Sequence, residues 1–192
     1  SYDGSVIEVG AEDLASAEVT TRDIDLGAFP HFLLKEISES PASFRKTLRA
    51  KLIERDGSLV VDVGNDALPD AIRERLSAGA LRRVLVIGQG TAAVAGQSLA
   101  AALADLASSR LVVEALPATE LSGFRLTEDM TETLVIAISQ SGTTTDTNRT
   151  VDLARSRGAV VISIVNRRGS DLTDRSDGVL YTSDGRDVEM SV

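Results

Sequence analysis

Cysteine is absent from the 192 residues, and histidine occurs once, as His31. The lack of cysteine excludes disulfide bonds, thiolate metal sites and a cysteine nucleophile within this chain. One histidine cannot build a three-histidine zinc site, and a single histidine at the start of a helical pattern is more typical of a cap or packing residue than of a catalytic group. We therefore expect no metal site and no cofactor.

Long apolar runs are also missing. The sequence has no stretch of about 18 apolar residues and no basic leader followed by an apolar segment, so it predicts neither a membrane span nor a signal peptide. We expect a cytoplasmic protein with no membrane partner. The formal net charge of −9 argues against a nucleic-acid partner, which would require a basic face. It does not exclude an anionic ligand, because a local cluster of donors can oppose the overall charge.

The apolar share of 43% supports a core for one domain of ordinary size plus an arm. Residues 1–29 are rich in Asp, Glu and Thr without a firm period, so we interpret them as an N-terminal arm or linker. The chain starts at Ser1 and stops on Val192 without a turn signal, so we expect a fragment of a longer protein, truncated at its C-terminus. No internal repeat is visible.

Residues 30–80 predict a helical lead-in. A helical pattern opens after Pro30, and Ser40-Pro41 favours a break or kink, because Ser can cap and Pro suits the first position of a new helix. Apolar side chains then recur at spacing four, at Phe44, Leu48 and Leu52, which predicts an amphipathic helix to about residue 54. A short helix from residue 65 or 66 to 76 is expected next.

Beyond residue 80 the hydrophobic pattern changes to continuous apolar runs that alternate with stretches of helical periodicity. The runs predict strands at 84–87, 111–113, 134–138, 160–165 and 179–181, and helices are expected at 92–106, 118–123, 145–157 and 170–176. Strands that read apolar on both faces indicate a parallel sheet covered on both sides. The fold class is therefore α/β, a three-layer α/β/α sandwich with a five-stranded parallel sheet in the flavodoxin-like order 2-1-3-4-5.

The third run leads into a hydroxyl-rich stretch, Ser-Gln-Ser-Gly-Thr-Thr, which we call the hydroxyl loop (residues 139–144). It precedes a predicted helix, and helix N-termini stabilise anions through unpaired N–H groups and a partial positive charge. The loop contains no Lys or Arg, so an anion would be held by neutral dipoles. The alternative is that these hydroxyls only cap the helix, but five hydroxyl side chains between residues 139 and 145, at one strand–helix junction, favour an anion site.

A second loop follows the first run: Gly88-Gln89-Gly90-Thr91, the glycine loop (residues 88–91). In open parallel sheets ligands bind beyond the carboxyl ends of the strands, where the strand order reverses. In the order 2-1-3-4-5 the first and third strands are neighbours at that point. Both loops would therefore line one crevice, and this convergence carries the binding hypothesis.

A nucleotide-binding domain is the rival interpretation. Gly88, Gly90 and Ala93 form a weak match to the dinucleotide fingerprint, with Glu114 as the acidic residue expected about 20 positions later. The hydroxyl loop has no explanation in that scheme.

Residues 87–96 and 139–147 resemble the two signature loops of the sugar isomerase (SIS) family of phosphosugar-binding domains. The segment 31–41, which contains Lys-Glu-Ile and then Pro, is similar to the entry helix of one branch of that family, the isomerase part of the glutamine–fructose-6-phosphate aminotransferases. Residues 166–177 and 185–192 are similar to later segments of the same branch. The resemblance covers roughly residues 30–192.

The resemblance implies a hexose 6-phosphate ligand. The residues that it places on the phosphate are Ser139, Gln140, Ser141 and Thr144, and those that it places on the sugar are Thr91 and the backbone at Ala92. Position 92 is more often serine in the family, so here one hydroxyl is missing. It also implies a homodimer, and a full-length protein whose glutaminase domain and second SIS domain are missing from this chain.

Aldose–ketose isomerisation needs a base near C1 and C2, typically Glu, His or Lys, and neither loop contains one. Asp146 falls in the first helical turn, where a carboxylate is more often a dipole partner than a base, and Asp187 and Glu189 are more typical of surface charge. We therefore expect a phosphosugar-binding part of an enzyme, with catalytic residues unknown, rather than a complete catalyst. A regulatory SIS domain that senses a phosphosugar stays open as an alternative.

Overall fold

The computed structural model describes residues 10, 25–107 and 111–183. Most of the predicted arm, residues 1–9 and 11–24, lies outside this part, as do Asp187 and Glu189. Within it, the main sheet has the order β4-β3-β5-β6-β7, with every neighbouring pair parallel. Its strands are β3 (Arg83–Gly88), β4 (Val112–Pro117), β5 (Thr133–Ser139), β6 (Val160–Val165) and β7 (Gly178–Tyr181). The predicted parallel sheet and its order are confirmed.

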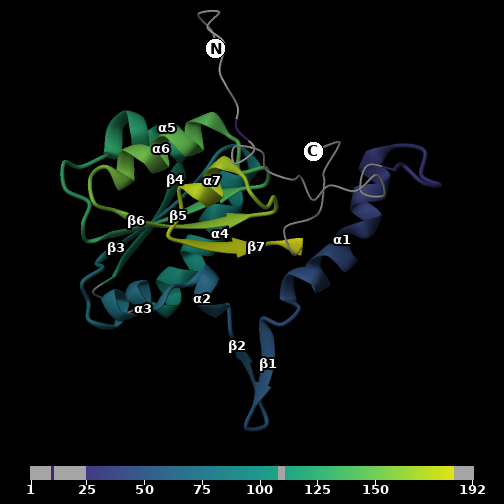
Figure 1. The fold of residues 1–192 in the computed structure, drawn as a ribbon, viewed down its shortest axis with the longest axis horizontal. Helices are drawn as coiled ribbons and strands as arrows, with labels where there is room; N and C mark the ends of the chain where they lie inside the picture. The colour runs from purple at the N-terminus through teal and green to yellow at the C-terminus, as the bar shows by residue number, and fades with distance from the viewer. Residues whose placement is uncertain (1–9, 11–24, 108–110, 184–192) are drawn as a thin grey trace, which may run out of the picture.

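Helices cover both faces of this sheet, as Figure 1 shows. One face carries α3 (Asp70–Ser77) and α4 (Thr91–Leu106), and the short α2 (Gly64–Ala67) lies against β7. The other face carries α5 (Ala118–Glu120), a π-helical turn (Leu121–Arg125), α6 (Thr145–Arg155) and α7 (Asp171–Asp174). The structure is thus the predicted three-layer sandwich. No described helix is long and apolar enough to cross a bilayer.

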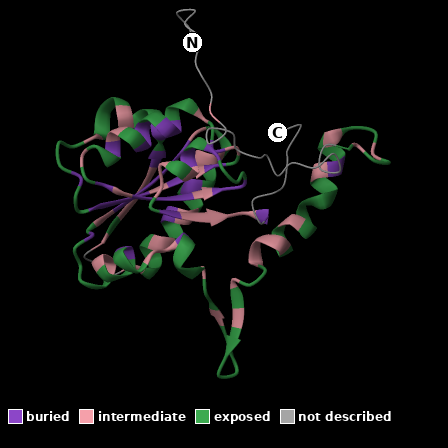
Figure 2. Cartoon of the chain, in the orientation of Figure 1, coloured by how far each residue is buried: buried purple, intermediate pink, exposed green. Residues whose placement is uncertain are grey.

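The core lies in two layers, one on each face of the sheet (Figure 2). Along β3, Leu85 and Ile87 face α6 and α7, whereas Val84 and Val86 face α3 and α4, and all four are buried. Because both faces are packed, the strands need apolar residues at successive positions, which explains the continuous apolar runs in the sequence.

The lead-in begins with one helix, α1 (Phe32–Leu48), which runs through Pro41. His31 caps it, since its Nδ1 accepts a hydrogen bond from the Leu34 N–H at 3.2 Å, so the prediction of a capping histidine is confirmed. The predicted break at Ser40-Pro41 is wrong. The Ser40 hydroxyl donates back to the Glu36 carbonyl at 2.9 Å, so it supports the turn before it rather than starting a new helix.

The predicted helix to residue 54 is also wrong beyond Leu48. Residues 52–61 form an antiparallel hairpin, β1 (Leu52–Arg55) and β2 (Ser58–Val61). Its two turn residues, Asp56 and Gly57, both have positive φ, 53° and 75°. This is the backbone that a two-residue hairpin with the right-handed strand twist requires, and Asp-Gly favours it strongly. The turn signal therefore outweighs the helical spacing of Phe44, Leu48 and Leu52.

The short helix expected at 65–76 is split into α2 and α3. Leu68 and Pro69 separate the two, because proline cannot donate to the helix and restricts the residue before it. The Asn65 side chain bridges the break by accepting the Asp70 N–H at 2.8 Å.

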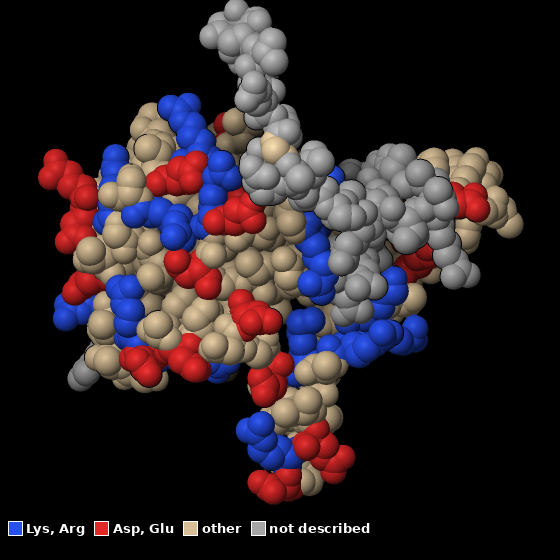
Figure 3. Space-filling model, viewed as in Figure 1, with Lys and Arg blue, Asp and Glu red and all other residues tan. Residues whose placement is uncertain are grey.

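Together α1 and the hairpin (residues 32–61) project from the sheet beside β7 (Figure 1). From here on we call this segment the arm; it is distinct from the N-terminal arm expected at residues 1–29. Figure 3 shows Lys and Arg side chains gathered where the arm meets the body. The last turn of α1 carries Arg45 and Lys46. Basic and acidic side chains are interspersed over the body and near the tip of the hairpin (Figure 3).

Candidate functional site

The two loops leave the sheet side by side. Strands β3 and β5 are parallel neighbours, with Ile87 opposite Ala137. The glycine loop follows β3 and the hydroxyl loop follows β5, so both lie at the carboxyl edge of the sheet. Beyond β3 lies β4, and beyond β5 lies β6, so the crossovers diverge between the two loops. This is the switch point at which open α/β sheets bind ligands.

The hydroxyl loop is folded by its own side chains. Ser139 is buried at the end of β5, where its Oγ accepts the Gly142 N–H at 3.1 Å and lies 3.4 Å from the Thr144 Oγ1. Ser141 is half-buried, and its Oγ accepts from the Thr143 N–H at 3.3 Å and the Thr143 hydroxyl at 2.9 Å. Gln140 is exposed, and its backbone carbonyl accepts the Asn166 N–H at 3.1 Å. The loop is thus a compact set of hydroxyls rather than an extended linker.

Helix α6 starts without a side-chain cap. Thr144 occupies the N-cap position, but its hydroxyl makes no hydrogen bond to the helix. The first backbone bond of the helix joins the Asn148 N–H to the Thr144 carbonyl at 3.0 Å. The N–H groups of residues 145–147 have no acceptor among the described residues, so they can bind an outside acceptor. The capping alternative is therefore not what the structure shows at Thr144. Asp146, in the first turn, is exposed.

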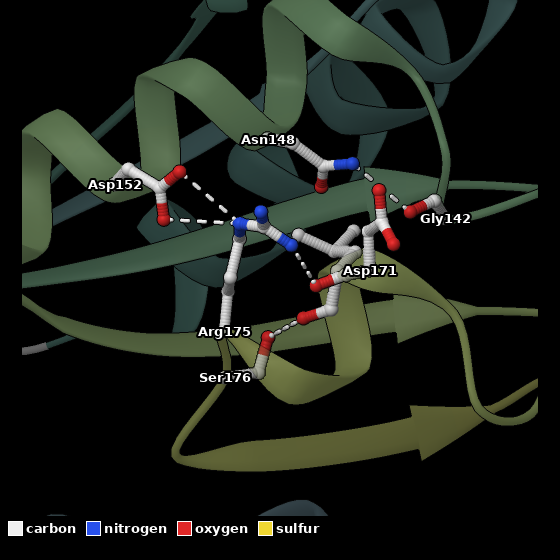
Figure 4. Close-up of polar contacts among 7 residues, drawn as sticks. Gly142, Asn148, Asp152, Asp171, Arg175 and Ser176 are labelled. Carbon is white, nitrogen blue, oxygen red and sulfur yellow. Dashed lines mark hydrogen bonds and ion pairs between the residues drawn. The ribbon is translucent and has the colours of Figure 1, made fainter. Parts of the chain in front are cut away.

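Gly142, which is buried, lies in the middle of the hydroxyl loop, and we call its peptide group the crest of the loop. Its φ is +67°, and a Cβ added there would lie 2.0 Å from the Ser170 Oγ, so no other residue fits without a shift. Its carbonyl accepts two hydrogen bonds, from the Asn148 Nδ2 at 3.1 Å and from the Leu172 N–H at 3.0 Å. Figure 4 shows the Asn148 amide pointing from α6 to this carbonyl. The crest is thus tied to both α6 and α7.

Sequence reasoning missed Asn148 and Ser170. Each belongs to an element that reaches the loop only through the tertiary fold. The one signal available was a polar residue, Asn148, at a buried position of α6 next to Thr147 and close to Val151, where an apolar residue is expected.

The glycine loop is built differently. A Cβ at Gly88 would lie 2.8 Å from the Ala92 carbonyl carbon, so the strand end and the start of α4 are in direct contact. The first amides of α4 are already bonded, Ala92 to the Gln89 carbonyl at 3.2 Å and Ala93 to the Gly90 carbonyl at 3.1 Å. Thr91 is exposed and Ala92 is half-buried. At the switch point the glycine loop offers the Thr91 hydroxyl, whereas α6 offers backbone N–H donors.

Glu114 does not fit the dinucleotide scheme. It pairs with Leu85 in the middle of β4, three positions before the level of Gly88, rather than at the strand end. Its carboxylate accepts hydrogen bonds from Arg125 at 2.6 Å and Arg83 at 3.2 Å. Burial raises the pKa of Glu114, but the two guanidinium groups outweigh it and hold the pKa below its usual value. The carboxylate is committed to an ion-pair cluster, and the nearby Gly-x-Gly has a packing explanation.

No cluster of three or more His, Cys, Asp or Glu side chains able to hold a metal ion occurs in the part of the chain that the structure describes. Apart from the exposed Asp146, the polar groups of the hydroxyl loop and of the first turn of α6 are hydroxyls, an amide and backbone N–H groups. Such groups suit a phosphate or another oxyanion.

These features define a class of protein: an α/β sandwich in which uncharged hydrogen-bond donors, suited to bind an oxyanion, lie at the switch point of a parallel sheet. The family model described as the SIS domain matches residues 80–192, more than half of the chain. The chain belongs to the SIS domain family.

Curated relatives carry the name glutamine–fructose-6-phosphate aminotransferase (isomerising). The relative from Pyrobaculum aerophilum is 36% identical over 178 residues, which cover 92% of this chain and 25% of the relative. The relative from Mycolicibacterium paratuberculosis is 38% identical over 184 residues, 93% of this chain and 26% of the relative. The chain thus spans about a quarter of the length of these relatives.

Solved structures show the same fold. The C-terminal domain of glucosamine-fructose-6-phosphate aminotransferase from Francisella tularensis aligns with a TM-score of 0.66 at 23% identity, over 85% of this chain and 42% of that one. Tagatose-6-phosphate ketose/aldose isomerase from Escherichia coli aligns with a TM-score of 0.61 at 21% identity, over 84% of this chain and 43% of that one.

Proposed function

We propose that this domain binds a hexose 6-phosphate, with its phosphate at the hydroxyl loop and the start of α6. The observation that carries the proposal is the N-terminus of α6, which has no side-chain cap and lies beside two pairs of hydroxyls at the switch point of the sheet. A phosphate dianion placed there would accept hydrogen bonds from the free backbone N–H groups and gain from the helix dipole.

The proposed contacts divide between the two loops. The side chains assigned to the phosphate are those of Ser139, Gln140, Ser141 and Thr144, and those assigned to the sugar are Thr91 and the backbone at Ala92. Ser139 is the most deeply buried of these, so its main effect would be to shape the loop through Gly142. Ser141 and Thr144 are half-buried and can reach an external ligand.

We further propose that the chain is the first SIS domain of an enzyme that converts fructose 6-phosphate to glucosamine 6-phosphate, with residues 30–80 as its helical lead-in and residues 1–29 as a linker. The names of the relatives support this, as does the coverage of nearly the whole chain in those alignments. In this proposal a glutaminase domain and a second SIS domain lie in the longer protein, which acts as a homodimer. The domain alone supplies binding rather than turnover.

The test is a calorimetric titration of the full chain with fructose 6-phosphate. Removing one hydroxyl contact to the dianion should weaken binding by about 1.5–3 kcal/mol in Ser141→Ala and in Thr144→Ala. Ser156→Ala is the matched control, because Ser156 is an exposed hydroxyl at the opposite end of α6. Unchanged affinity in both loop variants would remove the phosphate assignment.

A thermal-shift panel separates the remaining interpretations. Hexose 6-phosphates should raise the melting temperature, and NAD should not, because Glu114 is held by two arginines away from the crevice. A rise with NAD alone would favour the nucleotide interpretation. The synthase and sensor interpretations are separated by the longer gene product, because a glutaminase domain indicates the synthase.

A further inference from the structure

The carbonyl of Gly142 determines how the hydroxyl loop presents its donors. It accepts hydrogen bonds from the Asn148 side chain and the Leu172 N–H, so it points inward, toward α6 and α7. In a trans peptide the carbonyl and the following N–H point in opposite directions. The Thr143 N–H is therefore turned outward, where it meets the Ser141 hydroxyl at the exposed side of the loop.

The contact with Gly142 uses the Nδ2 of Asn148 and leaves the other polar atom of the side chain, the Oδ1, without a hydrogen bond to a described residue. Asn148 is 6% exposed. A buried polar atom without a partner costs stability. An apolar side chain would suit this buried position of α6 better, so packing alone does not account for an asparagine here.

The contact is the more consequential because Gly142 has positive φ and no side chain of its own to fix its peptide planes. The Leu172 N–H is a second donor to the same carbonyl, but it belongs to α7, a helix of four residues. Arg175 connects α7 back to α6 by donating its Nε to the Asp152 carboxylate at 3.0 Å and its Nη1 to the Asp171 carbonyl at 2.8 Å (Figure 4). Helix α6 thus supports the crest directly through Asn148 and indirectly through α7.

We propose that Asn148 is a positioning residue for the phosphate site: by holding the Gly142 carbonyl inward, it turns the Thr143 N–H toward the Ser141 oxygen, and this N–H then orients the Ser141 hydroxyl for the ligand. The proposal rests on the proposed function, and it adds a residue that does not touch the sugar phosphate. It assigns the asparagine a role in binding rather than in stability.

The experiment measures fructose 6-phosphate affinity and melting temperature together. Asn148→Leu removes the donor and fills the buried position, so affinity should fall at least about tenfold while the melting temperature is kept or raised. Thr150→Val is the matched control. Thr150 is fully buried on the same helix and donates to the Ala118 and Asp146 carbonyls, away from the loop. This variant should lower the melting temperature and leave affinity unchanged.

A second variant, Asn148→Asp, gives a pH readout that a merely structural role would not produce. An ionised carboxylate cannot donate to the Gly142 carbonyl, whereas a protonated one can. Its affinity relative to the wild type at the same pH should therefore be low at neutral pH and recover as the pH falls. If Asn148→Leu does not fold, the pH profile of Asn148→Asp alone decides whether Asn148 has this positioning role.

The outcomes separate the two proposals. If Ser141→Ala weakens binding but neither Asn148 variant does, the role of Asn148 is overturned and the proposed function stands. A drop in melting temperature that parallels the loss of affinity in Asn148→Leu, with no pH recovery in Asn148→Asp, also overturns it, because both then reflect general destabilisation. A wild-type chain that does not bind fructose 6-phosphate overturns the proposed function, and the role of Asn148 with it.

Discussion

The body and the arm of this chain are stabilised in different ways. In the body, the central strands bury successive residues on both faces of the sheet, and Leu85 and Val135 are fully enclosed. In the arm, Phe44, Leu59 and Val61 are 65–78% exposed (Figure 2). Local devices, the His31 cap and the Asp56-Gly57 turn, shape the arm. It is joined to the body by polar contacts, among them the hydrogen bond from the Ser183 N–H to the Thr47 Oγ1 at 2.9 Å. Apolar packing thus dominates in the body, and local backbone preference in the arm.

The largest effect should come from a cavity in the body. Leu85→Ala removes a fully buried side chain from the layer under α6, and we expect a loss of about 2–5 kcal/mol in the free energy of unfolding. Leu59→Ala, in the exposed strand β2, should change it by less than about 0.5 kcal/mol. Urea unfolding followed by circular dichroism measures both. Equal losses would mean that the arm is packed against something as firmly as the sheet.

Glycine substitutions compare a loop of the body with the turn of the arm. Gly142→Ala and Gly57→Ala both place a side chain at positive φ, which costs about 1–2 kcal/mol. At Gly57 the space around the new methyl is open, whereas at Gly142 it would overlap Ser170. We expect a further cost of about 1–3 kcal/mol for Gly142→Ala from this overlap.

Thermal unfolding of the two glycine variants checks this difference, and only Gly142→Ala should lose sugar phosphate binding as well. If Gly57→Ala proves the more destabilised, the turn rather than the packed loop is the sensitive point.

The ion pairs give a smaller contrast. Arg175 is about one-third exposed and joins α6 to α7 through Asp152, whereas Arg55 on the hairpin lies 3.8 Å from Asp62 with both side chains largely exposed. We expect Arg175→Gln to cost up to about 1 kcal/mol, and Arg55→Gln to have no measurable effect, because solvent screens exposed pairs. Denaturant midpoints at low and high salt test this. A salt-sensitive loss in Arg55→Gln would contradict it.

The smallest expected effect concerns pH. Arg125 and Arg83 lower the pKa of Glu114 in the folded chain, so the pair contributes stability above the unfolded-state pKa of about 4.3 and loses it as the pH falls through the lower folded value. Since the side chain is about one-third exposed, the difference between the wild type and Glu114→Gln should stay below about 1 kcal/mol at pH 7.

The Glu114 difference should vanish in acid, and unfolding curves at pH 7 and pH 3 show whether it does. Glu54→Gln, in exposed strand β1, is the control for the change in net charge. A difference that grows toward low pH would contradict the ion-pair account.

The same contrast explains which parts of the fold could be predicted. Residues 84–87, 134–138 and 160–165 are apolar at every or nearly every position because the sheet is covered on both sides, so their strands are readable from sequence. In the arm, Leu52 continues the spacing of a helix although it lies in a strand. Most positions of the arm are exposed, so the pattern of apolar residues there does not indicate which side chains are buried. The Asp-Gly turn signal therefore competed with an apparent helical spacing of four that the structure does not follow.

For the site, the two loops could be placed because strand order brings their ends together, and the hydroxyls stand in one run of sequence. The support behind the loop could not be predicted. Asn148 lies six residues after Gly142, and Ser170 lies 28 residues after it, and only the folded packing of α6 and α7 against the crest joins them. The assignment of each side chain to the ligand stays a prediction.

If the proposed function holds, the absence of Lys and Arg from the hydroxyl loop has a kinetic consequence. A chain with a formal net charge of −9 repels a dianion at long range, and a site made of dipoles exerts little attraction until the ligand is within contact distance. Electrostatic steering therefore cannot speed the encounter, and added salt should accelerate association by screening the repulsion. Recognition here would depend on the fit of the oxygen atoms after arrival rather than on the attraction that brings them.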